Sequence, residues 1–163
     1  MSHSVPFVSQ TQAVTYQKVA DYLTTSRLFK DSMRAIADRP KFDLLYESTM
    51  LEVEVFPWEI HPWDDSDMAI VRATSCVTIG TAMDTELMHY LLSENRRMQF
   101  GAFQLDDSSN VVFAESVLGG DSLDLLELQT CILCVAAIAD TYDDIISERF
   151  GGLRAIDRPS VPI

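Results

Sequence analysis

The spacing of apolar residues predicts two helices near the N-terminus. Apolar side chains between residues 13 and 23 recur at helical intervals, and Ser9 with Gln12 fits a capping box, so we expect a helix from about residue 10 to 25. Leu28, Phe29, Met33 and Ile36 form a similar pattern. This pattern predicts a second helical stretch that ends before Pro40.

The middle of the chain alternates with a period of two, which is typical of strands. Leu51–Val55 places apolar residues on one face and carboxylates on the other. Residues 42–47 belong to the same strand or to an adjoining one. Residues 68–79 form the next strand, and Asp84 caps a short helix that runs to about Glu94.

A hairpin follows this helix. Residues 98–105 and 111–118 are predicted strands, and the polar residues 106–110 form the turn between them. Both strands carry apolar residues on both faces. We therefore expect both faces of the hairpin to be covered, one by a helix and the other by a second subunit or a bound segment.

The last predicted element is a long helix. Asp121 or Ser122 caps it, it runs to about Arg149, and its centre at residues 131–139 is apolar all round. The order helix, strands, helix, hairpin, helix predicts an α+β fold. We expect an antiparallel sheet on which an N-terminal helix, a middle helix and a long C-terminal helix are packed.

We expect one folded unit. Residues 1–8 are predicted to be an N-terminal lead and residues 9–152 a single α+β domain. Residues 153–163, which contain Pro159 and Pro162, are predicted to be a loose C-terminal tail.

The charge of the chain is strongly acidic and unevenly distributed. Its 163 residues contain 12 Lys and Arg against 25 Asp and Glu, a net charge of −13. Nucleic acid and anionic membranes recruit clustered Lys and Arg, so neither is an expected partner. Residues 42–71 and 98–148 contain no Lys or Arg. These stretches are either ordinary solvated faces or a surface for a basic or amphipathic protein segment.

Cysteine usage and the N-terminal residues indicate the compartment. Three cysteines at uneven spacing are a poor disulfide framework and favour a reducing environment. The first residues lack the basic and apolar regions of a signal peptide, and the longest apolar run is too short for a membrane span. We expect a cytoplasmic protein.

The motifs that could carry chemistry each have a plainer interpretation. Cys131 and Cys134 lie inside the apolar helix and not at a helix N-terminus, where a thiolate would be stabilised. Glu86 and His89 have the spacing of one half of a di-iron motif, without the other ligands. His61, near Asp64, Asp65 and Asp67, fits no standard metal loop. We therefore predict no catalytic residue, metal or cofactor.

Aromatic residues are the candidates for binding a partner protein. Trp58 and Trp63 lie in an acidic loop flanked by prolines, where they either anchor an interface or pack on the sheet. Phe100, Phe103 and Phe113 belong to the hairpin. These five residues are the predicted partner-binding residues.

The hairpin region also carries a family resemblance. Residues Tyr90–Asn95, then Phe100-Gly-Ala-Phe103, a polar turn, Val111–Phe113 and a long acidic helix resemble the YbjN-domain family, whose members look like type III secretion chaperones. The resemblance covers about residues 85–150, and the loop at 57–65 departs from the family pattern. It implies a compact, often dimeric α+β fold that has no known catalytic residues and binds an extended or amphipathic segment.

Three functions are open at this point. The leading hypothesis is a non-catalytic chaperone-like or adaptor protein that binds a protein segment as a homodimer. The alternative is a signalling regulator that binds a small ligand between the sheet and a helix. A third hypothesis, an acid/base enzyme, requires that Asp140, Asp144, Glu86 or His89 is buried in a cleft.

Overall fold

The computed structural model describes residues 5–58 and 68–158. In these residues the order of elements is α1 (Gln10–Thr25), β1 (Arg34–Ala35), β2 (Lys41–Tyr46), β3 (Thr49–Pro57), β4 (Ala69–Ile79), α2 (Thr85–Asn95), β5 (Ala102–Leu105), β6 (Val111–Leu118), α3 (Leu125–Phe150), β7 (Leu153–Arg154) and the 3₁₀ helix η1 (Ala155–Asp157). The strands form one antiparallel sheet in the order β1-β2-β3-β4-β6-β5, and β7 pairs with the end of β4. The predicted α+β class is confirmed.

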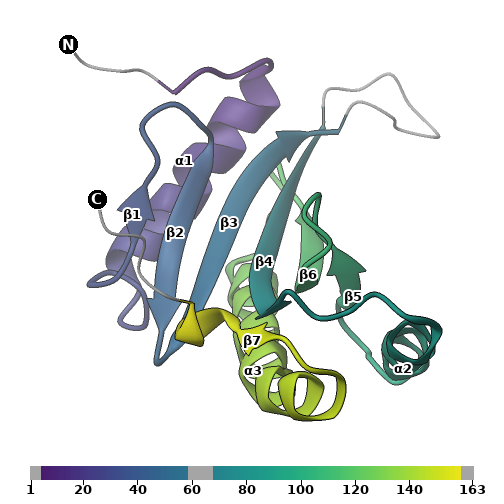
Figure 1. The fold of residues 1–163 in the computed structure, drawn as a ribbon. Helices are drawn as coiled ribbons and strands as arrows, with labels where there is room; N and C mark the ends of the chain where they lie inside the picture. Colours follow the sequence, from purple (N-terminus) through teal and green to yellow (C-terminus); the bar gives the residue numbers. More distant parts are fainter. Residues whose placement is uncertain (1–4, 59–67, 159–163) are drawn as a thin grey trace.

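The two faces of the sheet differ in cover. Figure 1 shows α1 and α3 lying against the same face, while β7 and η1 lie toward the other. Val53, Val55 and Val71 are fully buried beneath the helices. Their neighbours in the sequence, Glu52 and Arg72, point to the opposite face, over which the described residues place the short 3₁₀ helix η1 but no α-helix. Strict alternation along β3 and β4 therefore separates a core face from an open face.

Side chains cap all three helices. The Ser9 hydroxyl accepts a hydrogen bond from the Gln12 N–H at 3.1 Å, and the Asp84 carboxylate accepts one from the Leu87 N–H at 2.9 Å. Both caps are confirmed. Asp124, and not Asp121 or Ser122, caps α3 by accepting from the N–H groups of its first turn.

Helix α3 is the central packing element. Its buried side chains include Leu128, Ile132, Val135 and Ile146, and it lies across β3, β4 and β6. By length and composition alone α3 would pass as a membrane span. Its buried face is instead part of the hydrophobic core that the sheet provides.

Two predicted segments fold differently. Residues 28–36 form turns and β1 in place of a helix, because Phe29 is fully buried between the rings of Tyr22 and Tyr46 and β1 pairs with β2. Residues 153–158, predicted to be a loose tail, form β7 and η1. Arg154 fixes this segment through ion pairs with Asp144 at 2.9 Å and Asp157 at 2.6 Å.

Candidate functional site

The strand β5 has its outer edge occupied by a side chain. The Asn95 carboxamide, at the end of α2, accepts a hydrogen bond from the Phe103 N–H at 2.6 Å and donates one to the Phe103 carbonyl at 3.1 Å. Phe103 lies opposite Phe113 of β6, but its N–H and carbonyl groups bond to Asn95 and point away from β6, as those of every second residue in an antiparallel strand do. Asn95 therefore takes the place that another strand would occupy.

A glycine determines where β5 begins. Gly101 has a φ of +72°, and a Cβ there would lie 2.6 Å from the Phe113 ring and 2.8 Å from the Ala114 carbonyl oxygen. Only glycine combines this backbone conformation with this close approach. Residues before Gly101 do not pair with β6, so β5 starts at Ala102 and not at the predicted residue 98.

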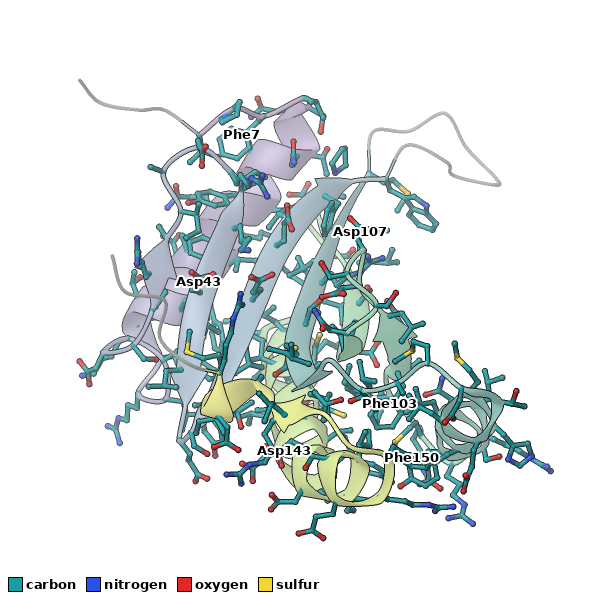
Figure 2. The ribbon with its side chains drawn as sticks, in the orientation of Figure 1. Phe7, Asp43, Phe103, Asp107, Asp143 and Phe150 are labelled. Atoms are coloured by element: carbon teal, nitrogen blue, oxygen red, sulfur yellow. The ribbon has the colours of Figure 1, made fainter. Side chains whose placement is uncertain are left out.

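Two aromatic contacts and an acid hold this corner of the molecule. The Phe103 ring contacts the rings of Phe113 and Tyr142 edge-on, with centroid distances of 5.1 and 5.0 Å. Figure 2 shows Phe103 between α2 and α3. The Tyr142 hydroxyl donates to Glu94 of α2 at 2.6 Å, and Arg97 pairs with the same carboxylate at 3.3 Å. Burial, and then the bond to Glu94, raise the pKa of Tyr142 to about 12. These contacts join α2, β5 and α3.

The opposite edge of the sheet is also occupied. The Ser32 hydroxyl donates to the Leu45 carbonyl at 2.8 Å and accepts from the Leu45 N–H at 3.3 Å. Arg34 of β1 lies opposite Asp43 in the strand pairing of β1 with β2, and the Ile36 N–H donates to the Lys41 carbonyl at 2.9 Å. The outward backbone groups of β2 therefore have partners along the strand.

The second half of β6 differs from both edges. Its pairing with β5 ends at Ala114, and none of the described strands pairs with it beyond this point on the side away from β4. The Gly119 N–H donates to Ala69 of β4, so the alternation of an antiparallel strand turns the N–H groups of Ser116 and Leu118 the other way. The Ser116 N–H is bonded to the Glu115 carboxylate at 2.9 Å.

The end of β6 is held firmly despite its open side. The Gly120 N–H donates to the Thr15 hydroxyl of α1 at 2.8 Å, and Lys18 donates to the carbonyl oxygens of Gly120 and Asp121. A Cβ on Gly119 would lie 2.7 Å from Thr15, so glycine is required there. The open edge is therefore part of a fixed strand.

A groove of about 560 Å³ runs beside this edge. It is lined by Glu115–Leu118 of β6, by Leu126, Glu127, Thr130 and Cys131 of α3, and by Phe100; we call it the β6 groove. Leu126 is 71% exposed and Phe100 56% exposed. An apolar groove open to solvent is typical of a site for another molecule.

The charge of the β6 groove is negative. Glu115 and Glu127 contribute carboxylates, and its lining includes no Lys or Arg. The sequence has neither residue anywhere between Met98 and Glu148. A cationic side chain placed in this groove therefore meets no like charge along its lining.

The predicted partner-binding residues lie in different places. Phe100 lines the β6 groove. Phe103 and Phe113 are buried in the core, 6% and 0% exposed, so neither ring is open to a partner. Trp58 is half-buried at the end of β3, where its backbone N–H donates to the Met68 carbonyl at 2.8 Å. Trp63 lies outside the described residues.

The motifs considered for catalysis do not form a site. Asp140, Asp144, Glu86 and His89 are all exposed, which contradicts the buried cleft that an acid/base enzyme requires. The described residues contain no cluster of His, Cys, Asp or Glu that could hold a metal ion. His61 and the acidic residues at 64, 65 and 67 lie outside them.

The cysteines of α3 are not activated. Burial raises the pKa of Cys131 to about 12 and raises that of Cys134 above its ordinary value. A reactive thiol requires a lowered pKa. The plainer interpretation of the Cys131-x-x-Cys134 spacing, packing in an apolar helix, fits these environments.

The helical side of the β6 groove carries no pattern in the sequence that marks it as a binding surface. Leu125 and Leu126 are 55% and 71% exposed in the first turn of α3, although they begin an apolar run. Two adjacent leucines just after the capping Asp124, outside the buried stripe of the helix, were the available signal.

One family model matches the chain. It is described as TY-Chap1, the type III secretion system (YopN, CesT) and YbjN peptide-binding chaperone 1, and it matches residues 60–158. No curated protein gives a significant match. The family match spans more than half of the chain and includes α2, the hairpin and α3. The resemblance seen in the sequence is confirmed, and the chain belongs to this family of peptide-binding chaperones.

Proposed function

We propose that this protein is a non-catalytic chaperone or adaptor that holds a segment of a partner protein in the cytoplasm. The observation that supports this most directly is the β6 groove, which is apolar, open to solvent and adjacent to an unpaired strand edge. Membership of a peptide-binding family gives the class of ligand. Exposed backbone and apolar surface together suit a polypeptide, because strand edges and apolar pockets recognise extended chains.

A selection from a library of random peptides displayed on phage tests this function. We expect the immobilised full chain to enrich related peptides, and the enriched peptides to bind the free chain in solution. A chain that is folded by circular dichroism but enriches no peptide would contradict the proposal.

We also propose that the protein acts as a homodimer. Apolar side chains outside the groove support this, since Met88 and Leu92 on α2 are 37% and 70% exposed, and Leu45 and Met50 on the open sheet face are 43% and 58% exposed. Patches of this kind commonly mark interfaces. Size-exclusion chromatography with light scattering is expected to give twice the mass of one chain, and a strict monomer at high concentration would refute the dimer.

A regulator that binds a small ligand is the second candidate. The volume of the β6 groove lies in the range of small-molecule sites, and the groove lies between the sheet and α3, where the sequence placed such a site. The groove is open to solvent, however, whereas small-molecule sites bury most of the surface of their ligand. A thermal-shift screen against a metabolite library separates the two functions, because stabilisation by one compound class favours the regulator.

A further inference from the structure

We propose that a second groove, separate from the β6 groove, binds a phosphate group. This groove has a volume of about 570 Å³ and lies where α2 meets the end of α3; we call it the α2–α3 groove. Its lining consists of Thr85, Glu86, His89, Tyr90, Ser93 and Arg149. None of these residues lines the β6 groove. The inference goes beyond the proposed peptide-binding function, and either can fail without the other.

Arg149 is the charged donor of the α2–α3 groove. Its guanidinium lies over the rings of Tyr90 and Phe150, 4.9 Å from each centroid, and Phe150 lies on the side of α3 that faces α2 (Figure 2). Stacking on aromatic faces holds a guanidinium in place and leaves the N–H groups at its edge available. Its one ion pair among the described residues joins it to Glu86 at 3.9 Å, which is too long for a hydrogen bond. The rings therefore position Arg149, and its N–H groups are open to a ligand.

Helix α2 supplies further donors to the same groove. Thr85, His89 and Ser93 are four residues apart, so they lie on one face of the helix at intervals of about one turn. Their two hydroxyls and one imidazole can each donate a hydrogen bond to an anion. Within the described residues none of these three side chains is already used in a hydrogen bond. Donors from two helices therefore converge on one groove.

The charge at this end of the molecule suits an anion, although the chain as a whole is acidic. Arg96, at the C-cap of α2, lies three residues beyond Ser93 and hence on the same side of the helix. Glu86 contributes the one carboxylate of the lining, and its side chain is 75% exposed. Because it is loosely paired with Arg149, Glu86 competes with a bound anion for the guanidinium.

The number of donors favours a phosphate group over a carboxylate. A phosphate monoester carries about −1.5 to −2 charges at neutral pH and three acceptor oxygens, whereas a carboxylate has one charge and two oxygens. A guanidinium binds two phosphate oxygens at once, and the donors of α2 serve the third. The expected ligand is a phosphate group, carried by a phosphorylated segment of a partner or by a free metabolite.

Titration of the ¹⁵N-labelled full chain with inorganic phosphate tests the site. We expect saturable NMR shifts at the amides of α2 and at the Arg149 side chain, and much weaker binding of acetate at the same ionic strength. Arg149→Gln should weaken phosphate binding roughly tenfold or more. Arg34→Gln, which removes the same charge from an exposed position on β1, should leave it unchanged.

A gain of affinity gives a test that loss of structure cannot imitate. Glu86→Gln removes the competing carboxylate, and we expect about threefold tighter phosphate binding. No saturable shift with phosphate, equal binding of acetate, or unchanged binding in Arg149→Gln would each refute the site. Weaker binding in Glu86→Gln would refute the role of that carboxylate as a competitor and, with it, the proposed geometry.

Two further probes distinguish the sources of the phosphate group. One is a degenerate peptide library with a fixed central phosphoserine, compared with the same library carrying serine, and the other is glucose 6-phosphate. Both outcomes support the site: tighter binding of the phosphoserine library assigns it to a partner segment, and tighter binding of glucose 6-phosphate assigns it to a metabolite. If the phage selection enriches no peptide but phosphate still binds at Arg149, only the proposed peptide-binding function is refuted.

Discussion

Phe103 on β5 and Ser116 on β6 both direct a backbone N–H away from the paired side of the sheet, but they are satisfied differently. Asn95 reaches Phe103 from the end of α2 and bonds to both its N–H and its carbonyl oxygen. The Ser116 N–H bonds instead to the charged and partly exposed side chain of the preceding residue, Glu115. A neutral partner built into another element closes an edge permanently, whereas a local carboxylate can exchange for water or for a ligand.

The largest effect is expected at Gly101, which lies directly before the first residue of β5. Gly101→Ala places a Cβ against Phe113 and Ala114 at a φ of +72°. We expect it to lower the free energy of unfolding by about 3 kcal/mol, from the positive φ and the overpacking together.

Urea denaturation measures this loss, and Gly80→Ala is the matched control. Gly80 has a φ of +68° but no atom within 4 Å of the added Cβ. Its loss should be only about 1 kcal/mol. Equal losses at the two glycines would show that the close contact at Gly101 is unimportant.

Opening the closed edge is the next largest change. Asn95→Ala leaves the Phe103 N–H and carbonyl without their partner, and we expect about 2 kcal/mol of lost stability. The amide of Phe103 should exchange faster with deuterium, as measured by NMR, and self-association should rise. Ser93→Ala, at an exposed position of the same helix, should change neither property.

The contact that supports the closed edge has a pH dependence of its own. The folded protein raises the pKa of Tyr142 to about 12, above the ordinary value of about 10. Its contribution to stability is therefore complete below pH 10 and is lost as the pH rises toward 12. The difference in urea stability between wild type and Tyr142→Phe should shrink across this range. A constant difference would contradict the raised pKa.

The smallest effect on stability is expected at the open edge itself. Ser116→Pro removes an N–H that no other strand uses, so the free energy of unfolding should change by less than about 1 kcal/mol. Ala114→Pro is the comparison, because Ala114 pairs with Ala102 of β5. A loss at Ser116 as large as that at Ala114 would show that this edge is not free.

Local patterns predicted much of the fold. The alternation at Leu51–Val55, the cap at Asp84 and the polar turn before Val111 depend on neighbours in the sequence, and each lies where expected. Residues 28–36 could not be predicted in this way. Burial of Phe29 between two distant rings decides their conformation over the local helical pattern.

The candidate site was predictable only in part. The pattern of Asn95 followed by Phe100-Gly-Ala-Phe103 was recognised, but its physical content depends on contacts that the sequence does not display. Asn95 bonds to the outer backbone groups of Phe103 on β5. Gly101, directly before β5, packs closely against Phe113 and Ala114 of β6 at a positive φ. Phe100 is a predicted binding residue and lines the groove, whereas Leu126 is not predictable because its exposure depends on how α3 packs on the sheet.

The positions of the three cysteines make the protein suitable for footprinting by alkylation. Cys134 is half-buried, with its Sγ 3.9 Å from the Phe100 carbonyl, so it lies beside the β6 groove. Cys76 is half-buried on the opposite face of the sheet, and Cys131 is buried. A segment bound along β6 would slow the reaction of Cys134 with iodoacetamide while leaving Cys76 as an internal reference. The unmodified chain thus carries its own reporter of whether the groove is filled.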